Sequence, residues 1–224
     1  MHLGSSAQNH VGRAKKPRPN DYDSDHARRL REIVKSAADL FLDRGYHNVS
    51  MEDIAARVGL RKPTLYHYVK SKVDILTIIS HEYMGVAFAD QTASLGRRLS
   101  PAERLLEFMT GILAAVETHR GHMKVLFEYN RELPPRERKA IQQEKERFQA
   151  LLEQVIKSGV TSGEFRQVPT TLVTLGILGM CVWAYQWYQG SGARSPRQVA
   201  ELYLDLLING LKADSHAGLS PLGR

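Results

Sequence analysis

Apolar residues recur with the period of an α-helix along most of the chain, and this period constrains the fold more than any other feature. The first such segment shows the i, i+3, i+4, i+7 pattern on one face: Leu30, Ile33, Val34, Ala37, Leu40 and Phe41. Gly45 follows as a suitable C-terminal stop. Similar segments continue to about residue 212, and we find no convincing run of alternating residues that would suit a strand. The sequence therefore predicts an all-α protein.

Capping residues mark the expected helix boundaries. Four predicted helix starts carry Ser or Pro before or within the first turn: Ser50, Ser71, Pro101 and Pro134–Pro135. The first of these helices is short and ends at Gly59, the second runs past Met84, and the fourth ends at Gly159. The last two helices are expected at about 169–189 and 196–212.

The charge is positive and unevenly distributed. The 224 residues carry a formal charge of +7, and residues 1–80 hold 14 Lys and Arg against 9 Asp and Glu, a net charge of +5. A basic surface of this kind suits a polyanion, either nucleic acid or a membrane surface. The single cysteine, Cys181, excludes an internal disulfide and lies in an apolar run, which favours a buried thiol. No apolar segment near the N-terminus resembles a secretory signal, so we expect a cytoplasmic protein.

Residues 51–69 have the pattern of a helix-turn-helix. A short helix at about 51–58 is followed by a turn at 59–61 and a second short helix at about 62–69. The second helix would turn five polar or aromatic side chains outward: Lys62, Thr64, Tyr66, His67 and Tyr68. Such a helix fits the major groove of DNA. The alternative is an ordinary three-helix surface with solvated charges.

Residues 28–80 resemble the DNA-binding domain of the tetracycline-repressor (TetR) family. The matching features are Asp39-Leu40-Phe41, Arg44-Gly45, Ser50, Ile54-Ala55, Val58-Gly59, Pro63–Tyr66 and Ser71-Lys72. The chain departs from the family at Val69, where Phe is usual, and at Arg61, where Ser is common and caps the helix. An arginine at this position could instead reach the DNA backbone.

The resemblance implies roles for individual residues. Ser50, Tyr66 and Lys72 match positions that contact the DNA backbone, and Lys62, Thr64 and His67 match positions that commonly face bases. Residues 1–27 are expected to form a disordered basic arm, which could follow the DNA or simply keep the protein soluble.

The resemblance also implies an effector-binding and dimerisation domain at 81–213, followed by a flexible tail at 214–224. Residues 167–193 carry no formal charge, but Pro169 and Gln186 interrupt the run, so a buried core helix is favoured over a membrane span and no membrane partner is expected. On the last helix, one stripe suits either a dimer bundle or packing within the chain: Val199, Tyr203, Leu206 and Gly210.

Large adaptable side chains are the candidates for an effector pocket: Met109, Leu113, Met123, Phe127, Met180, Trp183 and Trp187. Each could equally be ordinary core. Arg131 could meet an anionic part of the effector. Segments 162–169 and 187–211 are similar to TetR-family repressors of actinobacterial fatty-acid and steroid catabolism, whose effectors are often acyl-coenzyme A (acyl-CoA) thioesters.

These observations predict a homodimeric repressor that a small, largely apolar effector, such as an acyl-CoA, releases from a double-stranded operator. A DNA-binding regulator without a small-molecule effector, constitutive or controlled by a protein partner, remains the alternative. An enzyme would need a nucleophile with its base, paired carboxylates or a metal set. We find none of these in the sequence, so no catalytic residue, metal or cofactor is expected.

Overall fold

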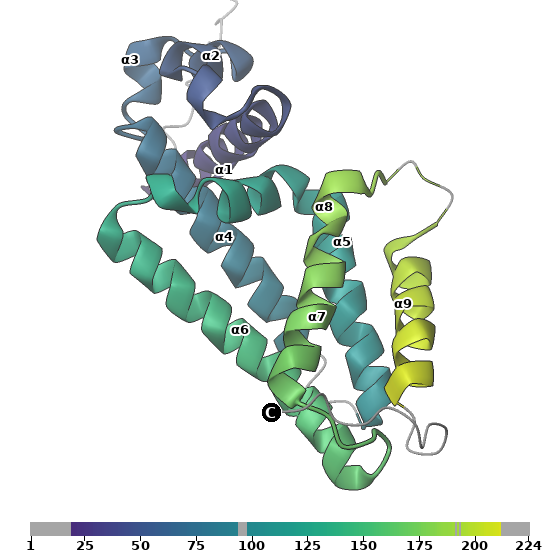
Figure 1. Ribbon diagram of the computed structural model, residues 1–224. Coiled ribbons are helices and arrows are strands. Elements are labelled where there is room, and N and C mark those ends of the chain that lie inside the picture. The colour runs from purple at the N-terminus through teal and green to yellow at the C-terminus, as the bar shows by residue number, and fades with distance from the viewer. Residues whose placement is uncertain (1–18, 94–97, 191, 193, 212–224) are drawn as a thin grey trace, which may run out of the picture.

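The computed structural model describes residues 19–93, 98–190, 192 and 194–211, and within these ranges it contains helices and no strand (Figure 1). The all-α prediction is confirmed. The elements follow in the order α1 (Pro19–Arg44), η1 (Tyr46–Asn48), α2 (Met51–Arg57), α3 (Lys62–Leu65), α4 (Lys72–Ala93), α5 (Pro101–Glu128), η2 (Asn130–Glu132), α6 (Pro135–Ser162), α7 (Thr170–Val182), α8 (Ala184–Trp187) and α9 (Pro196–Leu211).

The first three helices form a small unit at the top of the view in Figure 1. Ile33, Ile54 and Leu65 come from α1, α2 and α3 and are fully buried, so one shared core holds the unit together. The predicted start of α2 is confirmed, because Ser50 and Asp53 form a reciprocal capping box. Gly59 then makes the turn with a φ of 66°, a backbone conformation that favours glycine.

Three predicted boundaries are wrong. The second helix of the helix-turn-helix, α3, ends at Leu65 rather than at 69, since the amides of His67 and Tyr68 donate to carbonyls only three residues earlier. Helix α1 begins at Pro19, so residues 19–27 are helical and do not belong to a disordered arm. Residues 1–18 and the predicted tail at 214–224 lie outside the described residues.

The third boundary concerns α6, which continues past Gly159 and ends at Ser162. Gly163 takes the left-handed conformation with a φ of 79° and ends the helix instead. Gly159 has a packing role, because a Cβ atom built on it would lie 2.2 Å from Cδ2 of Phe165. The absent side chain lets the ring of Phe165 pack directly on the helix backbone.

Helix α5 bends sharply at His119, whose φ of −130° and ψ of 34° are not helical. In Figure 1 its first part runs beside α7, and its second part, 120–128, crosses beneath α1 before the chain enters α6. Nothing in the local sequence predicted this bend.

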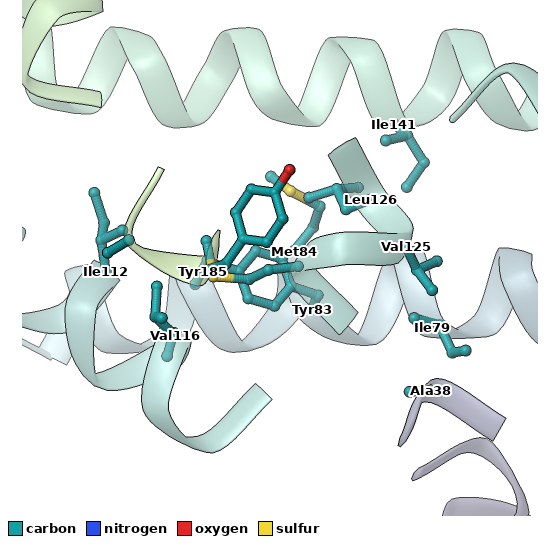
Figure 2. Packing of buried hydrophobic residues seen from close by; sticks show 14 of the residues in the cluster. Ala38, Ile79, Tyr83, Met84, Ile112, Val116, Val125, Leu126, Ile141 and Tyr185 are labelled. Atoms are coloured by element: carbon teal, nitrogen blue, oxygen red, sulfur yellow. The ribbon is translucent and has the colours of Figure 1, made fainter. Parts of the chain in front are cut away.

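Helices α4 to α8 enclose the core of the larger unit, and α9 packs on α5. Figure 2 shows Tyr83 and Met84 of α4 beside Ile112 and Leu126 of α5 and Tyr185 of α8. The predicted helix at 169–189 is divided into α7 and α8 at Trp183. Cys181 is fully buried, as predicted, and burial raises the pKa of its thiol to about 12. Among the described helices, none is long and apolar enough to cross a bilayer.

We expect Gly159→Ala to destabilise the protein although alanine is the better helix former. The buried ring of Phe165 would have to move, and overpacking of this kind costs about 1–3 kcal/mol, more than the ~1 kcal/mol that alanine gains over glycine in a helix. Gly85→Ala in α4 is the matched control, since its added Cβ would meet no described atom within 4 Å. Thermal unfolding should show a lower midpoint for Gly159→Ala and an equal or higher one for Gly85→Ala. Equal midpoint changes would contradict the packing role.

Candidate functional site

Helix α3 presents the side chains that the sequence placed against DNA. Leu65 is buried, whereas Arg61, Lys62, Thr64, Tyr66 and His67 are all exposed. Arg61 occupies the N-cap position but makes no capping hydrogen bond with its side chain to any described residue. The helix is therefore anchored by one buried leucine, and its polar side chains lie on the surface. Ser50, which caps α2, is exposed as well.

Lys62 is held by an ion pair with Glu52 at the start of α2. The hydrogen bond between the two groups raises the pKa of Lys62 and lowers the pKa of Glu52. To contact a DNA base, the ammonium of Lys62 would have to break its ion pair with Glu52 or bind the base and Glu52 at the same time. Sequence reasoning missed this partner, which is ten residues away in the chain.

Lys72 has a structural role that the sequence did not reveal. Its Nζ donates to the carbonyl oxygens of Tyr46, at 2.8 Å, and Val49, at 2.9 Å, and lies 4.3 Å from the centre of the Tyr46 ring. Burial lowers the pKa of this ammonium. Lys72 thus ties the start of α4 to the segment before α2, and it has one further donor hydrogen for a phosphate.

Tyr68 lies on α1 rather than on the outer surface of α3. Its ring stacks on that of His26, with 4.7 Å between the ring centres, and it is half-buried. Of the five side chains predicted to face outward, four do so: those of Lys62, Thr64, Tyr66 and His67.

A cavity of about 130 Å³ lies among α4, α5, α6 and α7. Most of its wall is apolar, and its lining comprises Tyr83, Met84, Ala87, Ile112, Leu126, Phe127, Lys145, Phe148, Gln149, Leu178 and Val182. Of the predicted pocket residues, Phe127 alone belongs to this lining. The sequence missed the contribution of α6, because its mixed polar and apolar residues read as an ordinary charged helix.

The other predicted pocket residues lie elsewhere. Met109, Leu113 and Met123 are fully buried in the core, Met180 is half-buried on α7, and Arg131 is exposed on η2. The two tryptophans point outward: Trp183 is 61% exposed and Trp187 is 47% exposed. The prediction that they flank the effector is therefore not supported by their positions.

Six large apolar side chains on α7, α8 and α9 or at their ends are exposed, and we call them together the exposed apolar face. They are Leu172, Leu175, Trp183, Trp187, Leu202 and Leu206. The stripe predicted on α9 is divided, since Val199 is buried within the chain while Leu206 is 60% exposed. Large apolar side chains gathered at a surface mark an interaction site.

The second part of α5 connects the cavity to the helix-turn-helix unit. Gly121 packs on α1 so closely that a Cβ on it would lie 2.6 Å from the carbonyl oxygen of Ala38. Lys124 Nζ donates to the carbonyl oxygen of Leu42 at 2.9 Å. Just beyond the helix, the rings of Tyr129 and Tyr46 lie 5.5 Å apart. We call these three contacts the α1–α5 joint.

Two family models and several known proteins match the chain. Residues 33–77 match the model of the bacterial regulatory proteins of the tetR family, and residues 98–211 match the tetracyclin repressor-like C-terminal domain. The HTH-type transcriptional repressor KstR2 of Mycolicibacterium smegmatis is 26% identical over 205 residues, which span 88% of this chain and 98% of KstR2.

Two solved structures share both the fold and part of the sequence. PfmR, a TetR-family transcriptional regulator from Thermus thermophilus, is 30% identical with a TM-score of 0.75, over 80% of this chain and 98% of PfmR. AibR in complex with isovaleryl coenzyme A and operator DNA is 28% identical with a TM-score of 0.71, over 80% of this chain and 97% of AibR. The helix-turn-helix unit and the helical C-terminal domain match together, and the chain belongs to the TetR family of bacterial transcriptional regulators.

Proposed function

We propose that the protein is a cytoplasmic, homodimeric repressor that a small, largely apolar effector releases from operator DNA. One observation carries the proposal: the second part of α5 forms a wall of the cavity and also makes the α1–α5 joint. Leu126 and Phe127 line the cavity, while Gly121 and Lys124 contact α1. A ligand that displaces this segment would move α1 and the helices packed on it.

The coupling follows from differential binding. An effector shifts the protein only as far as its affinity differs between the DNA-competent and DNA-incompetent arrangements. Helix α4 offers a second route, since Tyr83, Met84 and Ala87 line the same cavity and the helix begins beside α3. The effector would therefore touch both helices that lead to the DNA-binding unit.

The size of the cavity indicates the size of the effector. A cavity of about 150 Å³ is large enough for benzene, and the present cavity is close to this at about 130 Å³. A branched acyl group of about five carbons has a similar volume, and isovaleryl coenzyme A is bound by the related AibR. A short acyl thioester is thus better supported than a polycyclic or long-chain thioester.

A series of acyl-CoA thioesters of increasing size tests the effector. We expect thioesters of about five carbons to raise the unfolding midpoint and to release operator DNA in a mobility-shift assay, because they fill the cavity without distorting it. Polycyclic thioesters should do neither. If no thioester and no other small apolar molecule releases the operator, the ligand-responsive function is excluded and regulation by a protein partner gains support.

The mobility-shift assay, repeated with the variant Lys124→Met, tests whether the α1–α5 joint transmits the effect of the ligand. This variant loses the bond to the Leu42 carbonyl and leaves the cavity lining unchanged, so effector affinity should persist while effector-induced release weakens by about fivefold or more. Lys139→Met, which alters an exposed lysine of α6, serves as the control. Release as complete in Lys124→Met as in the control would show that coupling does not pass through this contact.

We propose that the exposed apolar face on α7, α8 and α9 is the dimer interface, where it packs against a second copy of the chain. A helix-turn-helix unit spans one half-site, so specific binding to a palindromic operator requires two copies. We expect Leu175→Glu to convert a dimer into a folded monomer, because it places a charge among these exposed apolar side chains. Sedimentation measures the mass, and circular dichroism checks the helix content. A variant that remains dimeric would place the dimer interface elsewhere.

Base recognition is proposed for α3. We expect Lys62→Ala and Thr64→Ala to change the preferred sequence in a selection from random duplexes, with a loss of about 1–3 kcal/mol for each base contact removed. Both side chains are exposed, and Leu65 beside them keeps the helix anchored. Lys139→Ala, remote from α3, should leave the preference unchanged. Retention of wild-type affinity and preference in both α3 variants would refute this placement of the recognition helix.

A further inference from the structure

The apolar cavity has one polar side, which α6 provides. Lys145 and Gln149 line it together and are four residues apart, so they lie on the same face of the helix. Lys145 Nζ donates to the carbonyl oxygen of Leu126 at 3.0 Å and lies 4.6 Å from the centre of the Phe127 ring. Both of these partners also belong to the cavity wall.

The ammonium of Lys145 is incompletely satisfied. It has three donor hydrogens, and one backbone carbonyl accepts from one of them. Among the residues that the structure describes, no carboxylate lies within ion-pair distance of this nitrogen. Burial lowers the pKa of Lys145 to about 8. A desolvated lysine without a counter-ion is unfavourable for folding, and such arrangements are frequent where a ligand supplies the missing partner.

A structural role accounts for part of this arrangement. Leu126 lies in the last turn of α5, where carbonyl groups lack helical partners, and a cation there also interacts well with the helix dipole. Capping of this kind explains one hydrogen bond. It does not require the cation to line an apolar cavity, nor does it involve Gln149, whose amide adds a second donor to the same wall.

We propose that Lys145 and Gln149 form the head-group subsite of the cavity and bind the acyl oxygen of a short apolar acyl compound. This inference rests on the proposed ligand-responsive function. The hydrocarbon part would lie against Met84, Ile112 and Phe148, which form the apolar walls. The acyl oxygen belongs either to a free carboxylate, which would pair with the ammonium, or to a thioester carbonyl, which would accept a hydrogen bond from it.

Calorimetry with the full-length protein tests the subsite. The two ligands are isovalerate, a free carboxylate, and isovaleryl coenzyme A, the thioester of the same acyl group. We expect wild-type protein to bind at least one of them and Lys145→Met to bind that compound about tenfold or more weakly, the loss typical of a charged hydrogen bond. Gln149→Leu should weaken binding to a smaller extent. Lys157→Met is the matched control, because Lys157 lies on the same helix, is exposed and pairs with Glu153.

Operator binding without effector shows that each variant is folded. Unchanged affinity of Lys145→Met for the acyl compounds would overturn the subsite and leave the ligand-responsive function intact. The same conclusion follows if wild-type protein binds neither compound but another apolar molecule releases the operator. Failure of every small molecule would overturn both. Whichever of the two compounds binds more tightly shows whether the subsite takes the oxygen of a free carboxylate or that of a thioester carbonyl.

Discussion

The close contact between Gly121 and the backbone of α1 is the constraint on which the rest of the structure depends. It lies just after the bend of α5 at His119, beyond which the helix passes beneath α1. A side chain at residue 121 would keep the two backbones apart. Because of the bend, the second part of α5 lines the cavity and also contacts α1 of the DNA-binding unit. The two halves of the molecule therefore share a structural element.

Basic side chains hold several of these elements together by donating to backbone carbonyls. Lys72 binds the carbonyls of Tyr46 and Val49, Lys124 binds that of Leu42, and Arg120 binds that of Tyr185 at 2.7 Å. Leu42 lies in the last turn of α1, where carbonyls lack partners within the helix, so the ammonium of Lys124 satisfies one of them and lies at the negative end of the helix dipole. Part of the positive charge of the protein therefore serves the fold, and the net charge overstates the surface available to DNA.

The two apolar regions of the C-terminal domain differ in their solvent exposure and hence in their partners. The cavity is small and lies among four helices, which suits a small ligand. The face that carries Trp183 and Leu206 is open and spread over three helices, which suits another protein surface. Both regions are built mainly from large apolar side chains. Composition alone therefore cannot assign a tryptophan or a methionine to one or the other.

Much of the fold followed from the sequence because its signals are local. The Ser50 cap, the Pro101 start and the stop at Gly45 each depend on residues within about one helical turn, and the structure has all three. The exposed side chains of α3 were predictable for the same reason. Only the tertiary structure decided the bend at His119, the outward direction of Trp183 and the place of Lys145 in the cavity wall. These features arise from contacts between segments far apart in the chain, which the helical period does not specify.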